Sequence, residues 1–516
     1  MKLLIGISLM LVAVVSFVAE QLGLMLPTIS WGYNLSRTAG ELVLFQPLKF
    51  LIENAGDVTA TVLLLFGVWL IISKIKSGPP NPVTIRKIQR FKAIKRGYYS
   101  FLILIGLAGF AALDQVVVGK EALAVEYKGS WTFPAFTTKL EKNKDFGIIE
   151  GGEADLEPDY RELKKKENYN VFLPLRPYAP TGDIIKALGR PINPSENDYK
   201  GLGTRLFDSE RPEKPHLRFT YRKGLRQGSV QGWDENENRV YQAKYVGGEL
   251  VDGSEEFTGE GTLVDFMGLS ENQEYDVSYP PSEPKWEFPL GTTSQGDDVL
   301  AYLFGGLQVN FKAALIYIPI VYFIGISVGL LMGYFGGWFD LVVQRLIEVL
   351  ANIPFLFLVI IVTLGVPPQY KDRLGFYLIL LLLAVFGWMG MTNLMRTAAL
   401  KEKARDYIAA SQVLGAGVPR ILFRHLMPNT VAILVTLIPF SISGVILSLT
   451  ALDYLGFVPS DLASWGKLLK DGLSSLSSPW LVSAAFACLV FLLVLVTFVG
   501  EAIREAFDPK KYTFYR

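Results

Sequence analysis

Cysteine and histidine are almost missing from this chain of 516 residues, which has one cysteine, Cys488, and two histidines, His216 and His425. A lone cysteine cannot form an internal disulfide, and Cys488 lies inside an apolar run near the end of the chain. The two histidines fall in unrelated regions, so we expect neither a zinc site nor a histidine-based catalytic site. No residue cluster suggests another metal, and none is assigned.

The chain also lacks a charge imbalance and a nucleotide-binding loop. The formal net charge is +1, which gives no indication of a nucleic-acid partner. The pair Gly466-Lys467 is not a phosphate-binding loop because no glycine lies five residues before Gly466, and no other Gly-x-x-x-x-Gly-Lys-Ser/Thr occurs. No credible nucleophile, base or metal set is present, so an enzyme is not expected and the chain itself holds no cofactor.

Long apolar runs are what the sequence has instead. Half of the residues are hydrophobic and the mean hydropathy is +0.31. A bilayer core requires roughly 17–25 apolar residues per helix. We therefore predict an all-α polytopic membrane protein of about eight spans, the second being the shortest, at residues 3–19, 58–73, 98–118, 308–333, 346–366, 374–395, 430–450 and 479–500.

The distribution of charge predicts the topology of these spans. The segment from Lys74 to Arg96 carries eight basic residues and no acid, which by the positive-inside rule makes it cytoplasmic. Each successive span reverses the side of the membrane. Starting from this cytoplasmic segment, both termini and the 396–429 loop are therefore expected inside, and the long 119–300 region outside. Residues 1–19 are either an uncleaved anchor or a cleaved secretory signal. The sequence Phe17-Val18-Ala19 lacks the usual small residue before the cleavage site, which favours the anchor.

The large outer region is expected to be β-rich or of mixed structure. It is polar, rich in glycine and proline, and contains short alternating stretches at 218–221 and 240–245. The segment from Tyr245 to Val251 is typical of two strands around a Gly-Gly turn. The glycine and aromatic spacing over 217–262 is consistent with a small β-meander with hairpin repeats and equally with irregular, loop-rich β structure.

The stretch from Leu400 to Asn429 is a basic, amphipathic loop between two apolar runs. Residues 401–414 have helical spacing, Gly415 with the following Ala416 and Gly417 ends that helix, and Pro419 suits the first turn of a second one. Pro428 is expected to break the chain into the next span. An ordinary interfacial loop that contacts lipid headgroups is the alternative interpretation.

This loop closely resembles the cytoplasmic coupling loop, or EAA loop, of the membrane subunits of binding-protein-dependent ABC importers. The residues that match the pattern of the oligopeptide/dipeptide class are Tyr407, Ile408, Ala410, Leu414, Gly415, Ala416, Pro428 and Asn429. The glutamate of the motif is Ala409 here, its second alanine is Ser411, and its arginine is Gln412. Any charge contact from the glutamate position would have to come from Arg405 or Asp406.

Two further segments carry the same resemblance. Residues 288–300 look like the Pro-Leu-Gly-Thr signature that precedes a span in this class, with Gly291, Thr292, Gly296 and Asp298 in place and Asp297 where the family has arginine. Thr292 and Ser294 are expected to cap a helix that contains both aspartates, and 298–312 to run along the outer membrane surface. The remaining matches are at 465–469, 478–481 and 500–510, and 172–177 resembles the subgroup linked to microcin C and oligopeptide uptake.

The resemblance implies the C-type permease subunit of a type I ABC importer in the bacterial inner membrane. Such a chain pairs with a sister permease, two cytoplasmic ATP-binding subunits that hold ATP and magnesium, and a periplasmic solute-binding protein. The cargo implied is an oligopeptide or peptide-like solute, with nickel, opines or glycosides as rivals. An envelope receptor or scaffold that only uses the spans as anchors is the rival from another class.

The predicted organisation has four parts. Residues 1–97 form a two-span extension with a basic linker, 98–118 the first core span, 119–297 the periplasmic domain, and 298–516 the permease core with the coupling loop at 397–429.

The span at 430–450 has a face of small residues, Ser441, Ser443 and Gly444. This face serves either close helix packing or pore lining. The residues that touch the cargo are not indicated.

Overall fold

The computed structural model describes residues 10–16, 65, 68, 82–137, 141–148, 156–183, 185, 188–192, 201–207, 214–259, 262–269, 273–365, 368–459 and 462–507. The spans predicted at 3–19 and 58–73 lie largely outside these residues. The chain separates into two compact units. One contains residues 1–180, 301–470 and 483–516, and the other contains 181–300 and 471–482.

Four helices of the described chain are long and apolar enough to cross a membrane: they lie within α9 (Val299–Phe335), α12 (Pro368–Lys403), α15 (Met427–Tyr454) and α17 (Pro479–Phe507). A bent pair, α10 (Gly337–Ala351) and α11 (Phe355–Gly365), raises the number to as many as five. The two helices of the pair meet at 74°. The span predicted at 346–366 is therefore interrupted between α10 and α11, because Pro354 cannot continue the hydrogen-bond ladder of α10.

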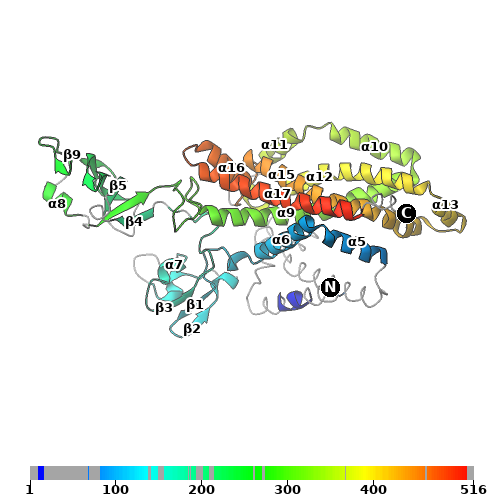
Figure 1. The fold of residues 1–516 in the computed structure, drawn as a ribbon, viewed down its shortest axis with the longest axis horizontal. Coiled ribbons are helices and arrows are strands. Elements are labelled where there is room, and N and C mark those ends of the chain that lie inside the picture. The colour runs from blue at the N-terminus through cyan, green and yellow to red at the C-terminus, as the bar shows by residue number, and fades with distance from the viewer. Residues whose placement is uncertain are drawn as a thin grey trace. The chain divides into compact units, whose positions relative to one another are not determined.

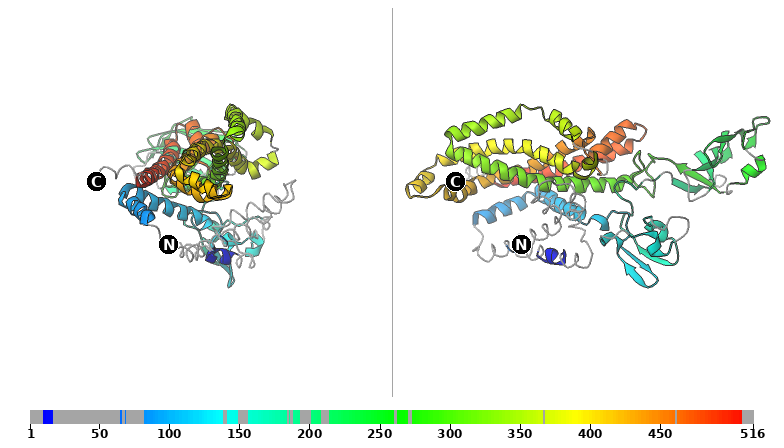
Figure 2. Two further views of the ribbon diagram at one scale, coloured as in Figure 1. Left: turned by 90° about the vertical axis from the view of Figure 1, so that its right-hand side faces the viewer. Right: turned by 180° about the vertical axis from the view of Figure 1, so that it is seen from behind.

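Helices α9, α12 and α15 run side by side (Figures 1 and 2). They share one buried core, to which α9 contributes Leu330, α12 contributes Met395 and α15 contributes Leu434. Helix α9 contains Pro319 yet continues for 37 residues. The separate surface helix predicted for 298–312 is therefore not formed: that segment is the first part of α9, and most of its residues from 301 to 310 are buried.

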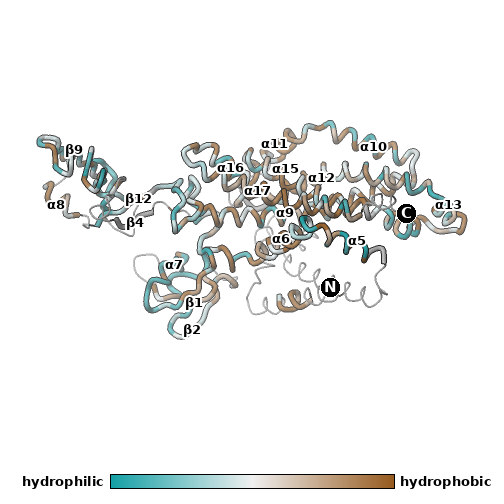
Figure 3. Tube along the Cα trace, in the orientation of Figure 1, coloured by the Kyte–Doolittle hydropathy of each residue, from teal (hydrophilic) through white to brown (hydrophobic). Residues whose placement is uncertain are grey.

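The first predicted core span, at 98–118, is shorter in the structure. It corresponds to α6 (Lys95–Ala112), which is followed by a 3₁₀ turn, η1 (Asp114–Val116). Helix α6 includes two basic residues at its start and is not among the four long apolar helices. A short helix, α5 (Pro82–Ala93), precedes it, and the two are separated by the non-helical Ile94. Figure 3 shows the change from the polar α5 to the apolar α6.

A small three-stranded sheet follows α6. Its strands, in the order β2-β1-β3, are β1 (Ala124–Tyr127), β2 (Ser130–Thr132) and β3 (Tyr169–Phe172), all antiparallel. The sheet packs on a core that includes Val125, Phe146, Leu163 and Val171. Short helical turns complete this part: η2 (Pro134–Phe136), η3 (Asn143–Phe146) and α7 (Tyr160–Leu163).

A second sheet of nine strands makes up most of the other unit. Its main path is β10-β9-β8-β6-β5-β12-β4, with β7 paired to β6 and β11 paired to β9. The elements are β4 (Leu188–Ile192), β5 (Gly201–Leu206), β6 (Pro215–Arg222), β7 (Leu225–Arg226), β8 (Gly228–Trp233), β9 (Arg239–Val246), β10 (Glu249–Leu250), β11 (Glu256–Phe257), α8 (Leu263–Met267) and β12 (Glu274–Ser278).

The strands predicted in this region are confirmed. Residues 218–221 lie in β6 and 240–245 lie in β9. The predicted Gly-Gly hairpin joins β9 to β10, where Val246 pairs with Glu249. Gly247 and Gly248 both have positive φ, as a tight two-residue turn requires. Of the two interpretations left open, the antiparallel meander is the one observed, because β6, β8, β9 and β10 pair in sequence.

Candidate functional site

The loop between α12 and α15 folds into short helical segments. Helix α13 (Asp406–Val413) is followed by α14 (Val418–Arg420), a π-helical stretch η4 (Ile421–Leu426) and then α15. Asp406 lies in the first turn of α13, where a carboxylate favours the positive end of the helix dipole. Gly415 has a φ of +74°, and its N–H donates to Gln412 O at 2.9 Å. The predicted glycine stop is thus confirmed, since this left-handed position suits glycine.

Two boundaries in this loop differ from the prediction. Residues 401–414 are not one helix, because α12 ends at Lys403 and Arg405 adopts an extended backbone before α13 begins. Pro428 does not break the chain: it lies in the first turn of α15, which continues directly from η4. Proline is tolerated there because the wider π-type turn has already shifted the backbone hydrogen-bond pattern that its missing N–H would interrupt.

Ile408 fixes α13 to the helices of the bundle. Its side chain is fully buried and shares a core with Met395 of α12, Ile421 and Leu426 of η4, and Leu434 of α15. Fully burying such a side chain contributes about 1.5–3 kcal/mol relative to exposure. Ile408 therefore ties α13 to both α12 and α15 through side-chain packing.

A chain of polar contacts also ties the loop together. The Tyr407 hydroxyl donates to Glu402 Oε2 at 2.7 Å, and Asn429 Nδ2 donates to the Tyr407 hydroxyl at 2.8 Å. Arg405 Nε lies 3.1 Å from Glu402 Oε2. Burial, followed by the hydrogen bond to Glu402, raises the pKa of Tyr407, so its phenol stays protonated and able to donate at neutral pH. The end of α12, the start of α13 and the start of α15 thus meet at Tyr407.

The opposite side of α13 is open. Ala409, Ala410, Leu414 and Gly415 are exposed, whereas Ser411 and Ala416 are half-buried. The tip is the most exposed part: Val413 is 88% and Leu414 is 86% accessible. Val413 was missed by motif matching because the family pattern has alanine at that position and valine does not match it. Small residues flanking two exposed apolar side chains form a surface that another protein can approach closely.

The Pro-Leu-Gly segment makes tight contacts within the second unit. Gly291 and Gly296 both have positive φ. A Cβ on Gly291 would come within 2.5 Å of Ser282 O, and one on Gly296 would overlap Ile185 O. Thr292 and Asp298 are fully buried. This segment therefore requires glycine at both positions for two independent reasons, backbone conformation and close approach.

The predicted caps of this segment are not formed. Helix α9 begins at Val299, after both aspartates. Thr292 Oγ1 instead accepts from Ser282 N at 2.8 Å, and Ser294 N donates to Asp471 Oδ2 at 2.9 Å. Asp297, which replaces the arginine of the family pattern, accepts from Gly182 N at 2.9 Å. Burial raises the pKa of Asp297 and outweighs its hydrogen bonds, which lower that pKa. The aspartate that stands in place of the family's arginine therefore lies in a buried turn and not on an exposed surface.

A row of glycines closes the contact between α9 and α12. Gly325, Gly329 and Gly333 recur every four residues on α9. A Cβ at each would come within 2.5–2.6 Å of a Cβ on α12, that of Met391, Met395 or Ala399. We call these three glycines the glycine seam. The backbones approach closely because no side chain separates them, the arrangement that small residues permit in membranes.

A cavity of about 320 Å³ adjoins the glycine seam, because Met391, which faces Gly325, is also one of its lining residues. It is lined from α9, α12 and α15 by Tyr317, Val321, Gly387, Gly390, Met391, Leu394, Leu437, Ser441, Gly444, Val445 and Ser448. A Cβ on Gly390 or Gly444 would meet nothing within 4 Å. The small-residue face around Ser441 and Gly444 therefore lines an open space and is not closely packed at Gly444.

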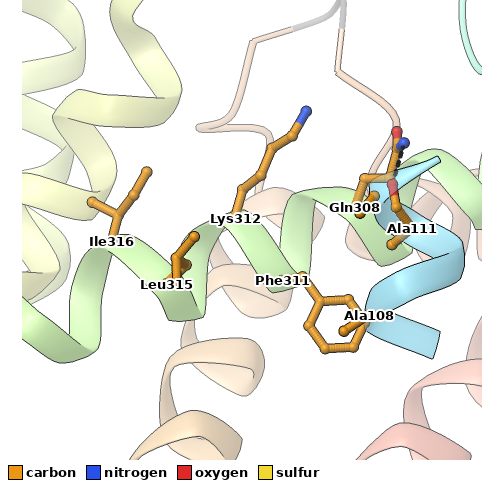
Figure 4. A pocket seen from close by; sticks show the side chains of 8 residues that line it. Ala108, Ala111, Gln308, Phe311, Lys312, Leu315 and Ile316 are labelled. Carbon is orange, nitrogen blue, oxygen red and sulfur yellow. Dashed lines mark hydrogen bonds between the residues drawn. The ribbon is translucent and has the colours of Figure 1, made fainter. Parts of the chain in front are cut away.

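A second cavity, of about 260 Å³, lies between α6 and α9. Figure 4 shows its lining, in which Phe311 and Lys312 project to different sides of α9. Gln308 Nε2 donates to Ala111 O at 3.0 Å and to Asp114 Oδ1 at 2.9 Å, so this glutamine ties α9 to the end of α6. The walls are otherwise mostly apolar.

The long apolar helices of the described chain define a polytopic membrane protein. The loop between α12 and α15 is anchored to them by Ile408 and is open at its tip. Residues 325–512 match the family described as binding-protein-dependent transport system inner membrane component. The chain belongs to this family and is a permease subunit of an ABC importer. The family assignment makes it a multi-pass inner-membrane protein that works with ATPase and substrate-binding partners.

Individual relatives extend this likeness over most of the chain. The chain is 29% identical over 434 residues to the peptidoglycan transport system permease protein YejE of Agrobacterium fabrum, covering 84% of this chain and 94% of that one. It is 29% identical over 432 residues to the inner membrane ABC transporter permease protein YejE of Escherichia coli, covering 84% and 98%. It is 32% identical over 240 residues to the oligopeptide transport system permease protein OppC of Mycobacterium tuberculosis H37Rv, covering 46% and 80%.

Proposed function

We propose that this permease moves oligopeptides or peptide-like solutes inward across the membrane, and that α13 receives the driving motion. The names of its relatives support the cargo class: they include oligopeptide and dipeptide permeases and a peptidoglycan transport permease. The geometry of α13 supports the coupling role. One observation carries it: on the same short helix Ile408 is fully buried while Val413 and Leu414 are almost fully exposed.

The coupling residues proposed are those of the loop and its hinge. The exposed members would contact a cytoplasmic ATP-binding subunit, and the Tyr407 contacts with Glu402 and Asn429 would keep α13 in register with α12 and α15. The proposed coupling set is Arg405, Asp406, Tyr407, Ala409, Ala410, Ser411, Leu414, Gly415 and Ala416, with Val413 added by the structure. Gly291, Thr292, Gly296, Asp298, Pro428 and Asn429 are proposed as structural or gating positions.

The complex proposed around this chain has four further components. A sister permease completes the pore, two cytoplasmic subunits bind ATP and magnesium, and a periplasmic protein delivers the solute. Both termini and α13 lie in the cytoplasm, and the two sheets lie in the periplasm. ATP binding favours one arrangement of the two permeases, so transport is a shift between two states of the helices.

The cavity among α9, α12 and α15 is the proposed place where the solute passes. Its polar groups are uncharged hydroxyls, those of Tyr317, Ser441 and Ser448. At Gly390 and Gly444 no side chain of this protein fills the adjacent space. Exposed backbone and hydroxyls can exchange hydrogen bonds with the amide groups of a peptide, whatever its side chains.

The coupling proposal is tested with the exposed tip. Replacing Val413 and Leu414 together by aspartate should leave the chain folded, because neither side chain is buried, yet reduce uptake of a labelled peptide at least tenfold. Leu175→Asp and Val264→Asp are matched controls, since Leu175, in the bend after β3, and Val264, on α8, are each 80% exposed. They should leave uptake within about twofold. Full uptake by the tip variant would contradict the coupling role.

The cargo is tested separately by competition. Peptides of two to five residues should displace the labelled peptide, whereas nickel salts, opines and glycosides should not. Displacement by one of those solutes and not by peptides would reject the cargo while leaving the coupling role intact. Co-purification of ATPase subunits with the chain, lost in the tip variant and kept in the controls, gives an independent measure of the contact.

A further inference from the structure

The segment that leads into α6 is the most strongly basic part of the chain. From Lys74 to Arg96 it carries eight basic residues and no acidic one. Six of them lie on α5 or at the start of α6: Arg86, Lys87, Arg90, Lys92, Lys95 and Arg96. Transport of the solute as proposed above uses none of these residues, so the charge needs a separate explanation.

One side of this segment is fixed to the last helix. Arg96 pairs with Glu501 of α17 at 3.3 Å, and Lys87 Nζ lies 4.5 Å from the centre of the Phe507 ring. A Cβ on Gly97 would overlap Ala502, so the backbones of α6 and α17 are in close contact here. Helix α5 is thereby held beside the end of a helix that is long and apolar enough to span the membrane.

The other side of α5 is both apolar and basic, and it is exposed. Ile85 is 39% and Ile88 is 50% accessible, and their three-residue spacing places them on the same side of the helix. Arg86 and Lys92 are also exposed. A helix that merely packed on the protein would bury this apolar stripe and expose the charges alone.

The exposed face continues into an apolar surface on α6. Phe101, Leu102, Ile103 and Ile105, which begin five residues after Arg96, are 39–52% exposed. Such a surface is suited to lipid acyl chains and unsuited to water. The order along the chain is therefore a basic amphipathic helix, two more cations, and then an acyl-facing helix, as expected where a chain crosses from the headgroup layer into the hydrocarbon.

We propose that the exposed face of α5, together with Lys95 and Arg96, binds anionic phospholipid headgroups. Ile85 and Ile88 lie at the boundary between headgroups and acyl chains, and the cations contact the phosphates. Clusters of four to eight Lys or Arg next to a membrane helix are suited to anionic lipid, each contributing about a five-fold preference. Through Arg96 and Glu501, the bound lipid also orients the end of α17.

Because the chain has a single cysteine, Cys488, a fluorescent label can be attached at one chosen position to test this proposal. In a Cys488→Ser background, Ile88→Cys is labelled with bimane and the full-length protein is reconstituted in vesicles. Brominated phosphatidylglycerol and brominated phosphatidylcholine are then compared as quenchers. We expect quenching by both lipids, about five-fold or more stronger per mole for phosphatidylglycerol, and a preference that falls as salt is raised. The same label at Ile85 provides a second reporter in case Ile88→Cys folds poorly.

Charge variants identify the source of the preference. Replacing Arg86, Lys92 and Lys95 together by glutamine should reduce the preference sharply, because only Arg96 of the proposed cations remains, and replacing Arg86 by lysine should retain it. Replacing the exposed Lys164, Lys165 and Lys166 by glutamine removes the same charge from the smaller sheet and should change nothing. A label at Glu235→Cys, in the exposed turn between β8 and β9, should be quenched by neither lipid.

Three results would overturn the proposal. Equal quenching by the two lipids would mean that the basic face selects no anionic headgroup. No quenching at either reporter would place α5 away from the bilayer, as expected if a protein partner covers it. An undiminished preference in the triple-glutamine variant, or its loss in the Lys164–Lys166 control, would assign the effect to other charges. None of these outcomes depends on the cargo or on the coupling role of α13.

Discussion

The glycine seam on α9 and two of the glycines that line the cavity, Gly390 on α12 and Gly444 on α15, lie in similarly apolar helices but have opposite surroundings. At Gly325, Gly329 and Gly333 an added Cβ would collide with α12, whereas at Gly390 and Gly444 it would meet nothing. The seam uses glycine to bring two backbones together, and the cavity uses it to keep space open. A small-residue face on a membrane helix therefore does not by itself indicate packing.

The largest expected effect is at the seam. Gly329→Leu would place a side chain against Met395 and the carbonyl oxygen of Thr392, where the backbone has to move, so we expect a loss of about 3 kcal/mol or more. The yield of monodisperse protein in detergent should fall sharply. Gly444→Leu, the same change beside the cavity, should give normal yield. Equal yields for the two variants would mean that the contrast between the faces is wrong.

The second prediction concerns transport. Gly444→Leu should fold but fill much of the cavity, and uptake of a labelled peptide should fall about tenfold or more because the solute path is narrowed. Gly109→Leu on α6 is the matched control, since its Cβ also meets nothing within 4 Å. If Gly444→Leu transports at the normal rate, the cavity is not on the solute path and the proposed role of this face is rejected.

The third prediction compares alanine substitutions in the glycine seam and beside the cavity. Gly333→Ala would bring a methyl group against Ala399 and the Arg396 carbonyl, so it should destabilise the protein by about 1–3 kcal/mol. Gly390→Ala should change stability by no more than about 0.5 kcal/mol. Thermal unfolding in the same detergent measures both. A more stable Gly333→Ala protein would show that the two helices can separate at little cost.

The smallest effect is expected at the edge of the cavity. The hydroxyls of Tyr322 and Ser441 lie 3.0 Å apart and join α9 to α15. Tyr322→Phe removes this hydrogen bond and should cost about 1 kcal/mol, as should Ser441→Ala. The double variant should cost little more than either single one, because both remove the same contact. Additive losses in thermal unfolding would mean that the two hydroxyls act independently.

Local patterns predicted much of the fold. The apolar runs mark α9, α12, α15 and α17, the Gly-Gly pair marks the turn from β9 to β10, and Gly415 marks the end of α13. The family motif also indicated the coupling loop. Each of these features depends on residues close together in sequence, through side-chain hydrophobicity or the backbone freedom of glycine.

Other features depended on contacts that no local pattern contains. The continuity of α9 through 298–312 is one of them, because most residues from 301 to 310 are buried against other parts of the protein. Val413 at the tip of α13 was missed because its exposure results from Ile408 being buried on the other side. The capping predicted for Thr292 and Ser294 failed because both residues bond elsewhere: Thr292 to Ser282, ten residues away, and Ser294 to Asp471, 177 residues away.

By itself the sequence determined that this is a membrane permease, because hydrophobic runs long enough to span a bilayer and the family's motifs consist of consecutive residues. Only the tertiary structure decided which glycines close a contact and which leave a cavity open, and which face of α5 stays uncovered. Those properties depend on what lies opposite each residue, and that is fixed only when helices far apart in the chain pack together.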